Sequence, residues 1–235
     1  MTLTVIPVTG VPEVQAGDDL ATLVVEAAAA QGTPLADGDC LVVTQKVVSK
    51  AEDRLVALDG DDRAARRALI DAESVRVLRR RGDLVISETR HGFVCANAGV
   101  DLSNVEAGWA ALLPVDADRS ARHVRDALRA RAGVELAVVV SDTFGRAWRN
   151  GLTDVAIGVA GLAAVVDLRG GTDGLGRELQ VTEVAVADEI AGAAELVMGK
   201  AARVAAAIVR GLDPSWRRDG SARELVRAPG DDLFR

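Results

Sequence analysis

One short stretch of the chain gathers several kinds of side chain that do chemistry. An apolar run at residues 135–140 is followed at once by Asp142 and Thr143, and the next few residues include Arg146 and Arg149. Carboxylate and hydroxyl oxygens are hard ligands for Mg²⁺ or Mn²⁺. Guanidinium groups match phosphate or carboxylate with paired hydrogen bonds. The pattern predicts a metal-assisted site for an anion, and a polar surface loop with one or two ion pairs is an equal alternative.

At two further positions in the sequence, an apolar run is followed directly by polar residues. One run leads into Gln45 and Lys50, and Asp101 is followed three residues later by Asn104. Because ligands of open α/β sheets bind where the strands end, a metal shared with Asp142 would need such a second oxygen-rich corner. The alternatives are a solvated helix start for the first place, which is the better interpretation of that pattern alone, and an Asx turn or helix cap for the second.

The composition restricts the class of protein. The chain has 235 residues, of which 49% are hydrophobic and only 3% aromatic, with a formal net charge of -7. These values predict a folded globular protein built from aliphatic side chains, and they argue against general affinity for nucleic acid or an anionic membrane. Cys40 and Cys95 have no metal-binding spacing and are expected to be small buried thiols. With no long apolar stretch, we expect a cytoplasmic protein.

Apolar periodicity and turn residues predict the elements that position these side chains. Adjacent strands without an intervening helix, at 83–100 and 153–168, indicate a mixed sheet, so the fold class is α/β with a mixed (α+β-like) sheet. The predicted strands are 3–8, 39–44, 83–87, 135–140, 153–159, 163–168 and 203–209, and the predicted helices are 18–30, 61–80, 116–132 and 182–200.

Two glycine-containing segments invite comparison with nucleotide-binding loops and fail it. Residues 192–200 end in Gly-Lys but have six residues between the glycines instead of four, and they end a helix instead of starting one. Residues 170–176 lack the Gly-x-Gly-x-x-Gly order. A nucleotide site in this chain would therefore be neither a P-loop nor a Rossmann site.

Four sequence blocks, in this order, resemble the coenzyme F420:L-glutamate ligase (gamma-glutamyl ligase) family, and the resemblance runs from residues 8–13 to residues 231–234. Each block alone is weakly specific, whereas the combination is highly specific. The blocks are Thr44-Gln45-Lys46-Val47-Val48-Ser49-Lys50, Ala98-Gly99-Val100-Asp101-Leu102-Ser103-Asn104, Ser141-Asp142-Thr143-Phe144-Gly145-Arg146-Ala147-Trp148-Arg149-Asn150-Gly151 and Thr182-Glu183-Val184-Ala185-Val186-Ala187-Asp188-Glu189-Ile190.

The resemblance implies an enzyme that adds L-glutamate to the deazaflavin precursor F420-0 while GTP is hydrolysed. An acyl phosphate would activate the terminal carboxylate, Mg²⁺ or Mn²⁺ would be the cofactor, K⁺ could assist, and further gamma-linked glutamates could follow. The resemblance also implies an intertwined homodimer. We expect residues 1–235 to form a single ligase unit with two possible sub-lobes, in the stand-alone form without a nitroreductase-like domain.

The resemblance also assigns residues. Asp101, Asp142 and Thr143 match the divalent-metal ligands of the family. Arg146 and Arg149, with the neighbouring Asn150, are assigned on chemistry to phosphate or to a substrate carboxylate. Gln45 stands where relatives often have Ser or Thr. The matches to the GTP contacts are Val11, Pro12, Glu13, Val14, Gln45, Lys50 and Asn104.

Two other functions fit the same blocks. The first is a non-catalytic module that binds GTP or a deazaflavin, and retention of Asp101, Asp142 and Thr143 speaks against it. The second is an amide ligase that uses a different acidic acceptor. The sequence leaves the second one open, because acceptor choice depends on the shape of a pocket.

Overall fold

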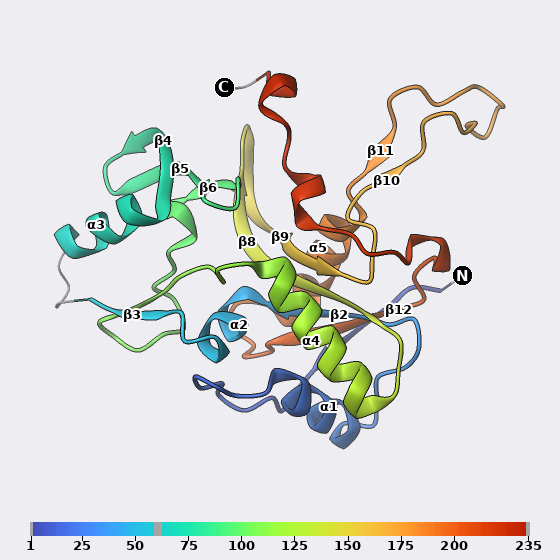
Figure 1. Ribbon diagram of the computed structural model, residues 1–235, viewed down its shortest axis with the longest axis horizontal. Helices are drawn as coiled ribbons and strands as arrows, with labels where there is room; N and C mark the ends of the chain where they lie inside the picture. Colours follow the sequence, from blue (N-terminus) through green and yellow to red (C-terminus); the bar gives the residue numbers. More distant parts are fainter. Residues whose placement is uncertain (1, 59–62, 234–235) are drawn as a thin grey trace.

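A central mixed sheet of five strands organises the molecule (Figure 1). The structure is a computed structural model that describes residues 2–58 and 63–233. The strand order is β1-β12-β2-β8-β9; β2 and β8 are parallel, and the other neighbours are antiparallel. The strands are β1 (Thr4–Val8), β2 (Cys40–Thr44), β8 (Ala137–Arg146), β9 (Arg149–Ala160) and β12 (Ala206–Arg210). The predicted mixed α/β fold is confirmed.

Helices cover both faces of this sheet. Helices α1 (Leu20–Ala30) and α4 (Ala117–Ala132) pack on one face, and α5 (Val186–Met198) packs on the other. Side chains alternate between the faces along each strand: in β2, Leu41 contacts the first cluster and Val42 the second. Each fully buried Leu or Val contributes roughly 1.5–3 kcal/mol. Both faces are therefore apolar, which explains the unbroken apolar runs in the sequence.

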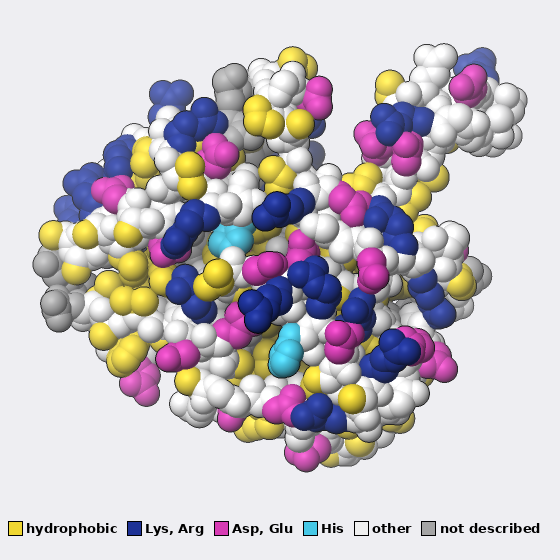
Figure 2. Space-filling view, viewed as in Figure 1, with side chains coloured by type: hydrophobic (Ala, Val, Ile, Leu, Met, Phe, Trp, Pro, Cys, Tyr) yellow, Lys and Arg dark blue, Asp and Glu magenta, His cyan; other side chains and the backbone are white. Residues whose placement is uncertain are grey.

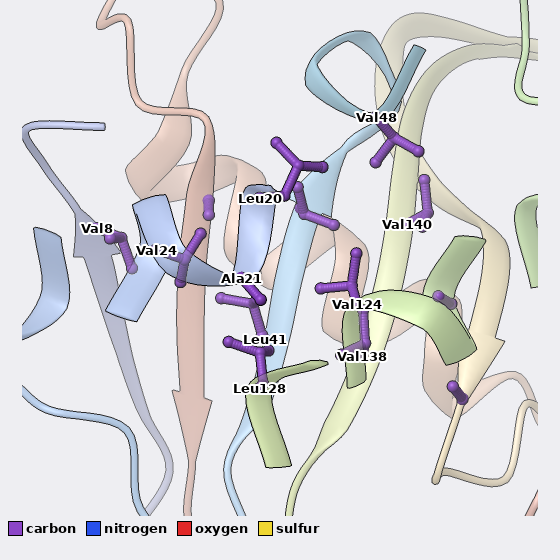
Figure 3. Close-up of a cluster of buried hydrophobic side chains, with 14 of the residues drawn as sticks. Val8, Leu20, Ala21, Val24, Leu41, Val48, Val124, Leu128, Val138 and Val140 are labelled. Atoms are coloured by element: carbon purple, nitrogen blue, oxygen red, sulfur yellow. The ribbon is translucent and has the colours of Figure 1, made fainter. Parts of the chain in front are cut away.

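Figure 3 shows the first of these clusters, in which α1 and α4 pack against one face of the central sheet. The side chains labelled there are Val8, Leu20, Ala21, Val24, Leu41, Val48, Val124, Leu128, Val138 and Val140.

Local hydrogen bonds and backbone geometry set the start of α1 and both ends of α4. The Asp19 carboxylate accepts from the Ala21 amide, and the Asp116 carboxylate accepts from the Arg119 amide at 2.9 Å. Each satisfies a backbone donor that the first helical turn leaves free. Gly133 ends α4 with a φ of 67°, a left-handed conformation that suits glycine.

Residues between β2 and α4 form smaller elements. Helix α2 packs on the first cluster through Val48, and several of the others surround a third apolar cluster that includes Ile70, Val85 and Leu112. Strand β3 pairs with β7, and β5 lies between β4 and β6. The elements are α2 (Gln45–Ala51), β3 (Leu55–Ala57), α3 (Arg63–Glu73), β4 (Ser74–Arg81), β5 (Leu84–Thr89), β6 (Val94–Ala96), the 3₁₀ turn η1 (Asn97–Gly99) and β7 (Trp109–Ala111).

The predicted helix over 61–80 is wrong in its second half. Helix α3 ends at Glu73, and Ser74–Arg81 is strand β4, paired antiparallel with β5. The Ser74 hydroxyl donates to the Ile70 carbonyl at 2.6 Å and so satisfies a terminal carbonyl of the helix. Tertiary pairing then overrides the helical spacing of the apolar residues. The predicted start at Asp61 lies outside the described residues.

Other boundaries also differ from the predictions. Strand β8 continues through the polar residues to Arg146, because β9 pairs with it along its whole length, whereas the predicted strand ends at residue 140. Only Val166–Asp167 of the predicted strand 163–168 is a strand, β10, which pairs with β11 (Glu183–Val184). Helix α5 consequently begins at Val186 instead of Thr182.

The chain after β12 forms three 3₁₀ turns, η2 (Pro214–Trp216), η3 (Ala222–Leu225) and η4 (Pro229–Asp231). Ala222 is buried in the second cluster and Leu225 packs against it, so this part of the tail docks on the central sheet. From residues 211–235 of the sequence, which are rich in Gly, Asp, Pro and Arg, we expect order only where residues 225–234 dock, and Phe234 lies outside the described residues. In the described part of the chain, every helix is too short or too polar to cross a membrane.

Candidate active site

A cavity of about 500 Å³ opens where the parallel strands β2 and β8 end. Thr44 and Ser141 are register partners in these two strands, so the residues that follow them meet at one edge. Helix α2, the segment around Asp101 and the end of α5 complete the walls. All ten residues predicted as metal ligands or GTP contacts line this cavity: Val11, Pro12, Glu13, Val14, Gln45, Lys50, Asp101, Asn104, Asp142 and Thr143.

Asp101 is held in place from several sides. Its backbone exchanges two hydrogen bonds with Ala111, at 2.8 and 2.9 Å, next to the end of β7. Its carboxylate accepts from the Ser103 amide at 2.7 Å and pairs with the Lys46 ammonium at 2.9 Å. Burial by itself raises the pKa of Asp101, but the hydrogen bonds from Ser103 and Lys46 outweigh it and lower the pKa. Asp101 is therefore a carboxylate kept ionised and oriented.

Asp142 is in a less compensated environment. Burial raises its pKa to about 7; the hydrogen bond from the Thr143 amide, at 2.8 Å, opposes this shift, and the negative charges of Asp101 and Asp154 add to it. A cation between Asp101 and Asp142 would relieve this repulsion. The positive charge of Lys46 offsets this repulsion only in part.

Thr143 and Ser141 both donate their hydroxyl hydrogens to Asp154, at 2.7 Å from Thr143 Oγ1 and 2.9 Å from Ser141 Oγ. Asp154 is on β9, directly opposite Thr143. Sequence reasoning missed Asp154, and the available signal was a carboxylate inside an otherwise apolar strand. It also missed Glu195, which lines the cavity from α5.

The donor set matches a hard divalent cation. Asp101, Asp142 and Thr143 offer two carboxylates and a hydroxyl oxygen, the ligand types that Mg²⁺ and Mn²⁺ prefer. Within residues 2–58 and 63–233, no group of three or more His, Cys, Asp or Glu side chains is arranged to hold a metal. The predicted metal ligands would therefore leave several coordination positions to water or to substrate oxygens, as Mg²⁺ commonly does.

The predicted GTP contacts line the same cavity as the aspartates. Lys50 pairs with Glu13, so two of these contacts already touch each other. Gln45 is 1% exposed, and its amide nitrogen donates to Ser49 Oγ and to the Leu112 carbonyl at 2.6 and 2.9 Å. Gln45 thus lines the cavity while its nitrogen supports the wall, and its contact with GTP stays a prediction.

The loop between α5 and β12 also lines the cavity, and its part in the site was not predicted from the sequence. It contributes Lys200 and Arg203, two cations that face the same space as Lys46 and Lys50. From the sequence, the Gly-Lys pair at the end of α5 was compared only with a P-loop. In the structure this pair lies at the helix end and lines the cavity.

Arg146 and Arg149 do not line this cavity. They are register partners at the exposed end of the β8–β9 hairpin, which projects from the central sheet (Figure 1). Arg146 donates to the Asn150 carbonyl at 3.0 Å, so the three residues form one cluster away from the aspartates. Their assignment to phosphate or substrate stays a prediction.

Comparison with known proteins identifies the family. A family model described as F420-0:Gamma-glutamyl ligase matches residues 10–211. The chain is 44% identical to the coenzyme F420:L-glutamate ligase of Methanothermobacter thermautotrophicus over the full length of both chains. It is 43% identical to the enzyme of the same name from Methanopyrus kandleri, with 100% of this chain and 98% of the relative covered, and 37% identical to that of Archaeoglobus fulgidus, with 100% and 97% covered. The chain therefore belongs to the F420-0:gamma-glutamyl ligase family.

Proposed function

We propose that this protein is a ligase that joins L-glutamate to the coenzyme F420 precursor F420-0, with GTP hydrolysis driving the reaction. One observation supports the proposal most directly: residues from four separate segments that match the family's metal and nucleotide positions line a single cavity. The names of the relatives support glutamate ligation to coenzyme F420. The dependence on GTP is inferred from the residues that match the family's GTP contacts.

The reaction has two steps in this proposal. The terminal carboxylate of the precursor attacks the γ-phosphorus of GTP, GDP leaves, and an acyl phosphate forms. The glutamate amine, after losing a proton, attacks the carbonyl carbon, and phosphate leaves as the amide bond forms. Because the substrate carboxylate is the nucleophile, no side-chain nucleophile is needed.

The residues of the cavity would act by binding and orientation. Asp101, Asp142 and Thr143 would hold a divalent cation, which when bound neutralises charge on phosphate and carboxylate oxygens. Lys46 and Lys50 would contact phosphate oxygens and draw the two anionic substrates together.

Lys200 and Arg203, which also line the cavity, would add positive charge near the nucleotide. Proximity of the reacting groups and stabilisation of developing negative charge are the two effects that this arrangement can supply.

The test measures phosphate release from GTP with Mg²⁺ or Mn²⁺, with and without L-glutamate and F420-0, while the product mass is followed. Phosphate release that needs both substrates, together with a mass gain of one or more glutamyl units, is the expected result. Binding of GTP or precursor without a mass gain would replace the proposal with a binding module. Turnover that occurs only with another acidic acceptor would mean that F420-0 is not the substrate.

The same assay covers the remaining proposals. Stepwise mass gains would reveal further gamma-linked glutamates, and repeating the assay with and without K⁺ tests whether that ion assists. A homodimer and a cytoplasmic location also stay predictions. Sedimentation of the protein would test the first.

A further inference from the structure

Asp154 is a buried carboxylate that the proposed reaction does not use. It is 3% exposed and lies beside the predicted metal ligands, yet its hydrogen bonds come from two neutral hydroxyls, those of Thr143 and Ser141. Its negative charge also acts on Asp142. Placing another carboxylate next to a buried aspartate costs stability, so the arrangement calls for a function.

The hydrogen bond from Thr143 restricts what its hydroxyl can do. A hydroxyl has one hydrogen and two acceptor lone pairs, and the hydrogen of Thr143 is committed to Asp154 at 2.7 Å. Toward the cavity, Thr143 Oγ1 can therefore only offer lone pairs. This suits a cation, and it prevents Thr143 from donating to a phosphate oxygen.

Strand pairing makes the arrangement rigid. Thr143 and Asp154 are register partners in the β8–β9 ladder, and Ser141 lies two residues earlier on the same strand as Thr143. Side chains two residues apart point to the same face of a strand. Asp154 is thus fixed where it can hold both hydroxyls at once.

We propose that Asp154 is a positioning residue: it holds the hydroxyl of Thr143 as an oriented oxygen ligand for the divalent cation. The inference rests on the metal site of the proposed function. Outer partners of this kind orient a metal ligand and increase its electron density, and their loss typically weakens metal binding about 10–100-fold. The hydrogen bond from Ser141 is expected to have no such effect, because Ser141 is not among the predicted ligands.

The test measures binding of Mn²⁺ alone to the full chain by electron paramagnetic resonance, without nucleotide or substrates. Asp154→Leu removes the acceptor, and we expect roughly 10–100-fold weaker Mn²⁺ binding. Asp154→Asn keeps one acceptor oxygen and should fall between Asp154→Leu and the wild type. Ser141→Ala is the matched control, and its affinity should stay within about twofold of the wild type because it leaves the Thr143 bond intact.

A double-mutant cycle separates positioning from simple charge. In a Thr143→Val background, Asp154→Leu should weaken Mn²⁺ binding by less than about threefold, because the hydroxyl that it orients is gone. An equal loss in both backgrounds would overturn the proposal and make Asp154 a direct ligand or a general source of charge. If Asp154→Leu does not fold, as judged by circular dichroism, the cycle is run with Asp154→Asn.

The outcomes also separate this inference from the proposed function. A wild-type chain that binds no Mn²⁺ would overturn both the metal site and the role of Asp154. A wild type that binds Mn²⁺, with unchanged affinity in both Asp154 variants, would overturn only the positioning role. Glutamate ligation, followed by mass, is independent of that second result.

Discussion

The two ends of the parallel strands β2 and β8 carry cavities of opposite character. The cavity at the carboxyl ends, about 500 Å³, contains the predicted metal and GTP positions. A second cavity, about 380 Å³, lies at the amino ends, where Asp39 precedes β2 and Glu135 precedes β8. Both cavities are lined by several charged side chains, so charge alone does not distinguish them.

Several charges at the amino ends are paired with one another. The Arg210 guanidinium binds both carboxylate oxygens of Asp39 at 2.8 Å, and Arg129 pairs with Glu135 at 2.7 Å. On the face shown in Figure 2, basic and acidic side chains are likewise interspersed over α4. At the carboxyl ends, in contrast, Asp142 faces Asp101 and Asp154 with its pKa raised to about 7 by burial and by their charges. Compensated charge stabilises the fold, whereas the carboxylate that its neighbours repel is the place where we propose that a cation binds.

The strongest test of this contrast is Asp142→Asn. We expect turnover of the ligase to fall by a factor on the order of 10³ or more, equivalent to ~4 kcal/mol, because one of the proposed metal-binding carboxylates is lost. Stability should change little, since the substitution also removes a repelled buried charge. Phosphate release and thermal unfolding measure the two effects. The matched control, Asp219→Asn at the amino-end cavity, should leave turnover unchanged; undiminished turnover in folded Asp142→Asn would remove Asp142 from the site.

Asp39→Ala should have the reverse effect. Asp39 is 1% exposed and accepts from Arg210 and from the Ala36 amide at 2.8 Å, so its removal should cost roughly 2–3 kcal/mol of unfolding free energy. Urea unfolding provides the measurement. Turnover per folded molecule should stay at the wild-type value. A loss of turnover in the folded variant would show that the amino-end charges take part in function, and the contrast would fail.

A smaller effect is expected for Lys50→Ala. The side chain is 12% exposed, pairs with Glu13 and lines the carboxyl-end cavity. Losing the proposed charge-assisted contact to phosphate should raise the KM for GTP about tenfold, with a smaller change in kcat. A GTP titration of turnover measures this, and an unaltered titration would take Lys50 out of the nucleotide site.

The smallest effect is expected for Arg129→Gln, which breaks the pair with Glu135. Both side chains are 64% exposed, and such pairs are worth little because water and salt screen them. The unfolding free energy should change by less than about 0.5 kcal/mol, and the KM for GTP should not change. A large loss of stability would mean that this exposed pair has a greater structural role than its exposure indicates.

Local sequence signals predicted those parts of the fold that local chemistry decides. The predicted helices 18–30 and 116–132 are examples, because their ends depend on Asp19, Asp116 and Gly133, each of which acts within one helical turn. The apolar runs at 39–44 and 135–140 likewise predicted the strands that meet at the site. Prediction failed where pairing with another strand determines the secondary structure. The spacing of apolar residues in Ser74–Arg81 predicts a helix, but this segment pairs with β5 as a strand. Strand β8 continues to Arg146 because it pairs with β9 up to that residue.

The sequence by itself determined the residue types of the site and the family to which the chain belongs. The family is indicated by the blocks around Lys50, Asp101 and Asp142 and by the order in which they occur in the sequence. Only the tertiary structure decided that these residues share one cavity and that Arg146 and Arg149 lie outside it. It also decided the place of Asp154 opposite Thr143, because strand register joins residues that are eleven positions apart in the sequence.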